Sequence, residues 1–161
     1  MTPPAIHLPP HRFKVVLVAP QIAPNTGNIA RLCVATGATL HLVRPLGFVL
    51  SDKEVRRSAM DYWPRLKLTL HDDLEAFLRA AAEDGGRIWM FSTKGERSHF
   101  DADFADGDWL VFGNETHGLP GSILARDPSQ VVRIPQAAGE RCLNLSTAAG
   151  IALYEALRRV T

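Results

Sequence analysis

Short apolar runs alternate with helical patterns along most of this 161-residue chain, and no other feature constrains the fold as strongly. Runs typical of strands cover residues 13–19, 39–45, 65–70 (a weak edge strand), 87–93, 108–113 and 131–135. Helical patterns cover residues 29–36, 52–60, 72–83 and 144–160, and a short helix starts at residue 122. Strands joined by helical crossovers lie parallel. The alternation therefore predicts an α/β fold, a three-layer sandwich with a mostly parallel sheet.

Length and composition set the outer bounds. The length suits one domain, predicted over residues 13–161, behind a flexible proline-rich segment over residues 1–12. The apolar runs are shorter than the roughly 18 residues of a membrane span, and the start lacks the apolar core of a secretory signal. Cys33 and Cys142 lie far apart without a CxxC pattern, which argues against a disulfide framework or a zinc site. We therefore expect a cytoplasmic protein without a metal or a membrane partner.

The net charge of +1 conceals two halves of opposite sign. Residues 1–70 hold nine Lys and Arg against three Asp and Glu, whereas residues 71–161 hold nine against fourteen. A basic first half is what a surface for a polyanion needs, although mixing of these charges by the fold into an ordinary solvated surface explains it equally well.

Three loops follow predicted strands at the sheet edge where α/β folds bind ligands. The first offers Asn25 or Thr26 as a helix cap and carries Arg31 in the first turns of that helix, where we expect it to point near this edge. In the second, glycines bracket Glu115, and the third places Asn144 at a helix start, where free N–H groups bind anions. Ordinary turn and cap chemistry explains each loop equally well. The signatures GxGxxG and GxxxxGK[ST] are absent, which disfavours a generic nucleotide-binding module.

Taken together, the loops carry more information. They read PNTGNIARLCVATGATLHLVRPLGF, LVFGNETHGLP and VRIPQAAGERCLNLSTAAGIALYEA, and the chain also contains DKEVRRSAMDYW and STKG. In this order the segments resemble the SPOUT superfamily of RNA methyltransferases. The match is closest to the small TrmL-type enzymes that methylate the 2′-hydroxyl of the wobble nucleotide of tRNA (cytidine or modified uridine 34), and it runs from Phe13 to Arg159. The resemblance implies a C-terminal trefoil knot, in which the chain after Ile134 passes through an earlier loop.

The resemblance also implies a cofactor, S-adenosylmethionine, held by the knot loops without a metal. Matched position by position, the donor pocket would consist of Phe91, Ser92, Thr93, Gly113, Ile134, Cys142 and Leu143. Backbone groups would read the adenine, and aliphatic side chains would sandwich it.

Four residues match the catalytic positions of the family, namely Arg31, Asn25, Glu115 and Asn144. A ribose 2′-hydroxyl is a poor nucleophile until its proton is being removed, so the protein must orient it and help with that proton. Arg31 is often assigned as the base in this family. A guanidinium stays protonated far above neutral pH, however, so we expect Arg31 mainly to stabilise the developing alkoxide and the neighbouring phosphate.

Three residues depart from the family pattern. Cys142 stands where serine is usual, which replaces a hydroxyl by a weaker hydrogen-bonding thiol. His117 stands where arginine is common and could make the RNA affinity depend on pH, and Asn114 replaces a usual proline.

The resemblance also makes tRNA and a second copy of the chain expected partners. Candidate phosphate contacts are Lys53, Arg56 and Arg57, with Arg12, Lys14 and Arg44. A homodimer is expected, with Ala148, Ile151, Ala152, Tyr154 and Glu155 of the last helix at its interface. Two alternatives stay open: a 2′-O-methyltransferase for another tRNA or rRNA nucleotide, and a catalytically silent RNA-binding relative.

Overall fold

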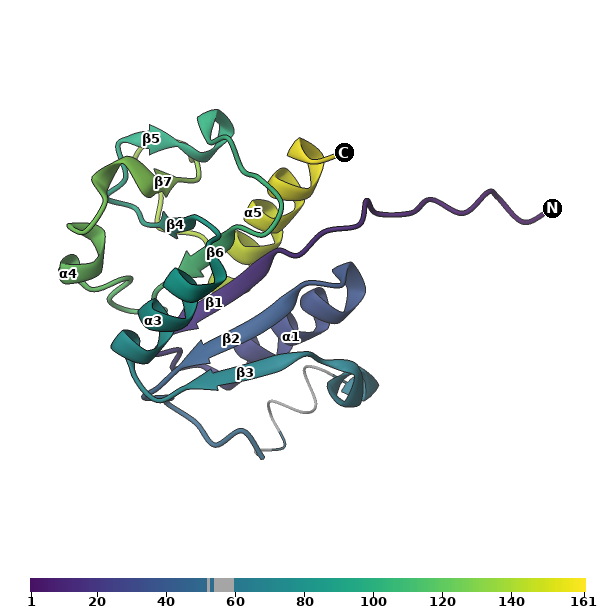
Figure 1. The fold of residues 1–161 in the computed structure, drawn as a ribbon, viewed down its shortest axis with the longest axis horizontal. Helices are drawn as coiled ribbons and strands as arrows, with labels where there is room; N and C mark the ends of the chain where they lie inside the picture. Colours follow the sequence, from purple (N-terminus) through teal and green to yellow (C-terminus); the bar gives the residue numbers. More distant parts are fainter. Residues whose placement is uncertain (52, 54–59) are drawn as a thin grey trace.

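The computed structural model of the chain describes residues 1–51, 53 and 60–161. Its centre is a seven-stranded sheet of order β3-β2-β1-β6-β4-β7-β5, in which every strand pair among these residues is parallel (Figure 1). The strands are β1 (Lys14–Val18), β2 (Thr39–Val43), β3 (Leu68–His71), β4 (Ile88–Phe91), β5 (Arg97–Ser98), β6 (Trp109–Phe112) and β7 (Val131–Arg133). The α/β class and the parallel sheet are confirmed.

Helices cover both faces of this sheet. The α-helices are α1 (Ala23–Thr36), α3 (Leu74–Asp84), α4 (Gly121–Leu124) and α5 (Leu145–Arg159), and the 3-10 helices are η1 (Met60–Arg65), η2 (His99–Asp101) and η3 (Pro128–Gln130). On β1, Val15 and Leu17 pack in one hydrophobic cluster with α1 and α5, whereas Val16 and Val18 pack in another with α3 and α4. Burial on both faces explains why the four residues of β1 after Lys14 are all apolar rather than alternating, and it confirms the three layers.

Two helix caps differ from the predicted ones. Helix α1 begins at Ala23, because Pro24 fits the first turn of a helix, where its missing N–H costs nothing. The prediction that Asn25 or Thr26 caps this helix is therefore wrong: both lie inside it and are buried. Asp73 rather than the predicted Asp72 caps α3. The helix predicted over residues 52–60 lies outside the described residues, apart from positions 53 and 60.

Helix α5 packs against α1 and β6 and presents one face to solvent. Ile151 and Tyr154 are 38% and 50% exposed on that face. Ala152 is completely buried in its own chain, so the prediction that it contacts a partner is wrong. Threading of this segment through an earlier loop stays a prediction from the resemblance.

The amino terminus leaves the body of the protein. The first ten residues form no helix or strand, and the tail extends away from the sheet (Figure 1). The tail is held at its base, where His11 Nε2 lies 2.7 Å from the Thr36 carbonyl and the Arg12 N–H donates to Asp106 at 2.6 Å. No helix among the described residues is long and apolar enough to cross a membrane.

Candidate active site

A cavity of about 400 Å³ opens at the carboxyl ends of β4, β6 and β7, where α1 and α5 begin. This is the sheet edge at which open α/β folds bind ligands, and the volume is that of a small-molecule site. All seven residues predicted for the donor pocket line the cavity: Phe91, Ser92, Thr93, Gly113, Ile134, Cys142 and Leu143. Three segments distant in sequence therefore meet in one cavity, as expected from the three loops.

Of the four residues predicted as catalytic, Asn25, Glu115 and Asn144 also line this cavity, whereas Arg31 does not. Three of the four predicted catalytic residues therefore share the cavity, and Arg31 lies elsewhere on the same chain.

The Glu115 carboxylate closes the turn that leads into α1. Its two oxygens accept hydrogen bonds from the backbone N–H groups of Gln21 at 2.8 Å and Ile22 at 3.1 Å. Ile22 is the N-cap of α1 but has no side-chain acceptor, and the first turn of the helix carries no acidic residue. Glu115 accepts the otherwise free N–H of the N-cap residue and places a negative charge near the positive end of the helix dipole. It thereby fastens the second loop to the first.

Asn144 joins the third loop to the first in a similar way. It is the N-cap of α5, because its Oδ1 accepts from the N–H groups of Ser146 at 2.9 Å and Thr147 at 3.4 Å. Its Nδ2 donates to Asn25 Oδ1 at 3.1 Å. The starts of α1 and α5 are thus bridged by two side-chain amides, and the capping role of Asn144 is confirmed.

The second loop folds so tightly that Gly113 tolerates no side chain. A Cβ at this position would lie 2.0 Å from the Gly118 carbonyl carbon and 2.2 Å from the Leu119 nitrogen. Asn114 shapes the turn between them, because its Oδ1 accepts from the N–H groups of Thr116 at 3.0 Å and His117 at 2.6 Å. Asparagine is well suited to such a turn, so the replacement of the usual proline has a structural reason.

Arg31 lies on the outer face of α1, exposed to solvent. It follows Asn25 by six residues, which places it about 9 Å further along the axis and about 120° around the helix. Its guanidinium carbon lies 5.7 Å from the centre of the Tyr62 ring in η1. Arg31 is therefore turned away from the cavity of its own chain.

The predicted phosphate contacts fall into three groups. Lys53 is exposed, and Arg56 and Arg57 lie outside the described residues. The others form ion pairs within the chain: Arg12 with Asp106 at 3.5 Å, Lys14 with Asp84, and Arg44 with Asp72 at 3.1 Å. These pairs join the basic first half of the chain to the acidic second half and neutralise much of the asymmetry.

Two cations at the cavity were missed from the sequence. Lys94 and Arg133 both line it, directly after Thr93 and directly before Ile134. They could have been found from the sequence, because each is adjacent to a residue already assigned to the pocket. Among the described residues, no three His, Cys, Asp or Glu side chains are grouped in a way that could hold a metal ion.

Both cysteines are free, and they differ in environment. Cys142 is exposed and lines the cavity. Cys33 is buried, and desolvation raises the pKa of its thiol to about 12, so it stays protonated and inert.

Comparisons with known proteins agree with this geometry. The chain is 48% identical over 148 residues to the tRNA (cytidine(34)-2′-O)-methyltransferase of Burkholderia ambifaria, which covers 91% of this chain and 95% of the relative. It is 46% identical over 149 residues to the enzyme of the same name from Escherichia coli (strain K12), at 92% and 94% coverage.

Solved structures show the same fold. One of them was described for structural insights into the 2-OH methylation of C/U34 on tRNA. It matches with a TM-score of 0.88 and 47% identity, over 92% of this chain and 96% of that one. An AdoMet-bound rRNA methyltransferase from Sinorhizobium meliloti matches with a TM-score of 0.85 and 30% identity, over 97% of this chain and 59% of that one. The family model of the SpoU rRNA methylases matches residues 12–154. The chain belongs to the SpoU rRNA Methylase family.

Proposed function

We propose that this protein transfers the methyl group of S-adenosylmethionine to the ribose 2′-hydroxyl of the wobble nucleotide of tRNA, cytidine or modified uridine 34. The observation that carries the proposal is the meeting of all three family loops in one cavity of suitable size. Relatives that match this chain over nearly their whole length are named for this reaction. Since tRNA is its substrate, we place the protein in the cytoplasm.

The cavity fits the methyl donor in chemistry as well as in size. Phe91, Ile134 and Leu143 offer apolar surfaces for the adenine, and Gly113 leaves backbone groups bare beside it. Lys94 and Arg133 supply positive charge that suits the carboxylate of the methionine part. When bound, S-adenosylmethionine supplies a methyl group already activated by its sulfonium charge. No metal is needed for this transfer.

Within the site we assign two kinds of role. Arg31 stabilises the developing alkoxide and the adjacent phosphate, as a fixed cation with a planar fork of donors. Asn25, Glu115 and Asn144 hold the loops in the geometry that receives the donor and the ribose. The bonds that both Glu115 oxygens accept from backbone N–H groups support a positioning role rather than that of a free base.

Because Arg31 faces away from the cavity of its own chain, we propose a homodimer in which Arg31 of one subunit serves the cavity of its partner. The exposed Ile151 and Tyr154 on α5 support this arrangement, since they offer apolar surface to a second chain on a helix that packs against α1.

Mixing two inactive variants tests the shared site. Arg31→Ala keeps the cavity, whereas Thr93→Trp fills the cavity and keeps Arg31. If Arg31 acts on its partner, mixed dimers contain one intact site, and methyl transfer returns after the two variants are unfolded and refolded together. Refolding each variant alone is the control. Absence of recovery, with mixed dimers demonstrated by mass spectrometry, would show that Arg31 acts within its own chain or that the dimer is wrong.

The reaction itself is tested by incubating the protein with labelled donor and total tRNA and mapping the methylated nucleotide by mass spectrometry. A 2′-O-methyl group at nucleotide 34 is the expected result. Methylation elsewhere in tRNA, or only in rRNA, would favour the alternative substrates. RNA binding without calorimetrically detectable donor binding would identify a silent relative.

A further inference from the structure

Among the residues that the structure describes, part of the positive charge in the first seventy residues has no carboxylate partner. The described cations of this half that form no ion pair with another described residue are Arg31, Lys53, Arg65 and Lys67. All four are exposed. Among the described residues, the excess positive charge of the first half of the chain is therefore concentrated on few side chains.

Two of these cations converge on one aromatic ring. The guanidinium carbon of Arg65 lies 4.8 Å from the centre of the Tyr62 ring, and that of Arg31 lies 5.7 Å from it. Tyr62 and Arg65 share a face of η1 because residues three apart eclipse each other in a 3-10 helix. Arg31 reaches the same ring from α1. We call these three residues the arginine–tyrosine cluster.

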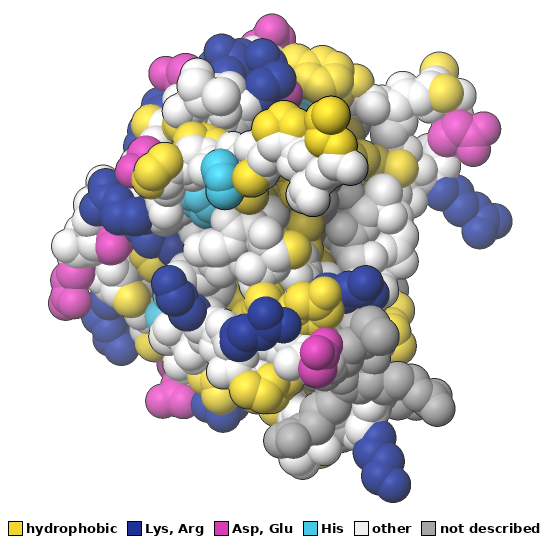
Figure 2. All heavy atoms as spheres, turned by 90° about the vertical axis from the view of Figure 1, so that its right-hand side faces the viewer, with side chains coloured by type: hydrophobic (Ala, Val, Ile, Leu, Met, Phe, Trp, Pro, Cys, Tyr) yellow, Lys and Arg dark blue, Asp and Glu magenta, His cyan; other side chains and the backbone are white. Residues whose placement is uncertain are grey.

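This arrangement favours an anionic ligand. Two like charges held near one ring repel each other, and the negative face of the ring offsets only part of that repulsion. The only carboxylate on η1 is Asp61, beside Tyr62 in sequence. Figure 2 shows this side of the molecule, where Lys and Arg side chains lie among hydrophobic ones. An anion bound at the cluster would be attracted by both guanidinium groups and would offset part of their repulsion.

We propose that the arginine–tyrosine cluster binds a backbone phosphate of the RNA substrate, with Tyr62 holding the two guanidinium groups in position. This inference rests on the proposed function, which supplies the RNA. Guanidinium groups are well matched to phosphate oxygens, and an arginine stacked on an aromatic ring loses little freedom on binding. The cluster lies on an open surface outside the cavity, which suits a chain of phosphates rather than a small anion.

The test measures binding of unmodified tRNA directly, over a series of salt concentrations, by fluorescence anisotropy. For Arg65→Gln we expect about a five- to eightfold weaker affinity near 0.1 M salt, and a slope of log K against log salt that is shallower by about one. Tyr62→Leu should weaken binding about two- to fivefold, and Tyr62→Phe should keep wild-type affinity, because the ring is what matters.

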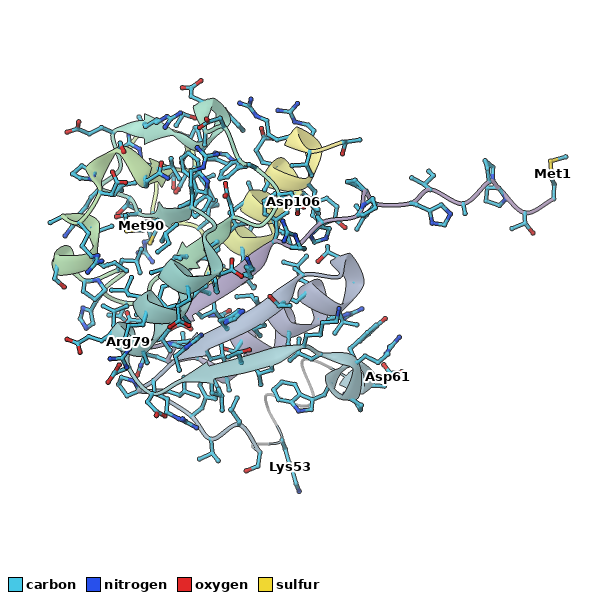
Figure 3. All side chains as sticks on the ribbon, viewed as in Figure 1. Met1, Lys53, Asp61, Arg79, Met90 and Asp106 are labelled. Carbon is cyan, nitrogen blue, oxygen red and sulfur yellow. The ribbon has the colours of Figure 1, made fainter. Side chains whose placement is uncertain are left out.

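Arg79→Gln is the matched control. Arg79 is an exposed arginine on α3, and Figure 3 shows it on the opposite side of the molecule from Asp61 of η1. It removes the same charge without touching the cluster, so it should change the salt slope little. Donor binding and thermal unfolding of every variant are measured alongside, to separate loss of RNA contact from loss of folding.

Unchanged affinity and slope in Arg65→Gln would overturn the inference, and so would an equal effect of Arg79→Gln. Equal losses in Tyr62→Leu and Tyr62→Phe would remove the role of the ring. These outcomes are distinct from failure of the proposed function, which would appear as the absence of methyl transfer to tRNA by the wild-type chain. Should Tyr62→Leu fail to fold, Arg65→Gln still decides, because Arg65 is exposed.

Discussion

The cavity and the arginine–tyrosine cluster hold their polar groups in opposite ways. Around the cavity, Asn25, Glu115 and Asn144 are all engaged in hydrogen bonds that join one loop to another. In the cluster, Arg31 and Arg65 are exposed, and their described interaction is with one aromatic ring. The first arrangement preorganises a rigid site for a small molecule, and the second leaves charge available to a flexible polyanion. Donor binding and RNA chemistry should therefore be separable by substitution.

Arg31→Lys is expected to have the largest effect on turnover. Lysine keeps the charge but loses the planar fork of donors, so we expect kcat to fall about a hundredfold. Donor affinity should not change, because the role proposed for Arg31 is to contact the ribose oxygen and the phosphate of the RNA rather than the donor. Single-turnover methyl transfer and calorimetry with the donor measure the two effects. Near-normal turnover would contradict any need for the fork geometry. A loss of donor binding would show that donor binding at the cavity and RNA chemistry at the cluster are not separable.

Gly113→Ala should act on the cavity instead. The new Cβ meets backbone atoms of Gly118 and Leu119, which cannot move aside without opening the loop. We expect the free energy of unfolding to fall by about 2 kcal/mol and donor binding to be lost with it. Chemical denaturation and calorimetry provide the measurements. Gly121→Ala is the matched control, since a Cβ there meets nothing within 4 Å. Equal behaviour of the two variants would show that the loop is not tightly packed.

Glu115→Gln separates positioning from proton transfer. The amide keeps the shape but offers one acceptor where the carboxylate offered two, and it removes the charge near the start of α1. We expect the free energy of unfolding to fall by about 1.5 kcal/mol, with a parallel and partial loss of turnover. Glu140→Gln, at an exposed carboxylate in the third loop, serves as the control. Complete loss of turnover at unchanged stability would mean that Glu115 is the catalytic base.

The bridge between Asn144 and Asn25 should have the smallest effect. Asn144→Ala removes both the cap and the bridge, so we expect about 1 kcal/mol lower stability by thermal unfolding. Asn144→Asp keeps an acceptor for the cap and loses only the donor to Asn25, and it should cost about half as much. If the two variants are equally destabilised, the bridge rather than the cap dominates at this position.

The sheet was largely predictable because each central strand is buried on both faces and therefore leaves a run of apolar residues. Helix starts were less predictable. At α1 the N–H of the N-cap residue Ile22 donates to Glu115, more than ninety residues away, so the local pattern at Asn25 and Thr26 pointed to the wrong cap. A side chain supplied from another loop leaves no mark in the sequence around the helix it caps.

The donor pocket could also be predicted from the sequence, but the position of Arg31 could not. The resemblance placed the seven donor-pocket residues in one cavity, and the structure brings them together. What the sequence did not reveal is the face on which Arg31 lies. The pattern put it near the ligand edge, but six residues along a helix turn a side chain by about 120°. Its nearness to Tyr62 depends on how η1 packs against α1, a tertiary contact that neither segment encodes alone.

One wall of the cavity comes from the start of α5, the last helix in chain order. A polypeptide cut after β7 would retain all seven strands and still lack that wall. Affinity for the donor therefore requires α5 to be in place, and the ligand would act as a reporter of the complete fold. A compound that binds only the completed fold raises its melting temperature by mass action, so a thermal-shift assay with the donor would distinguish complete molecules from truncated ones in a mixed preparation.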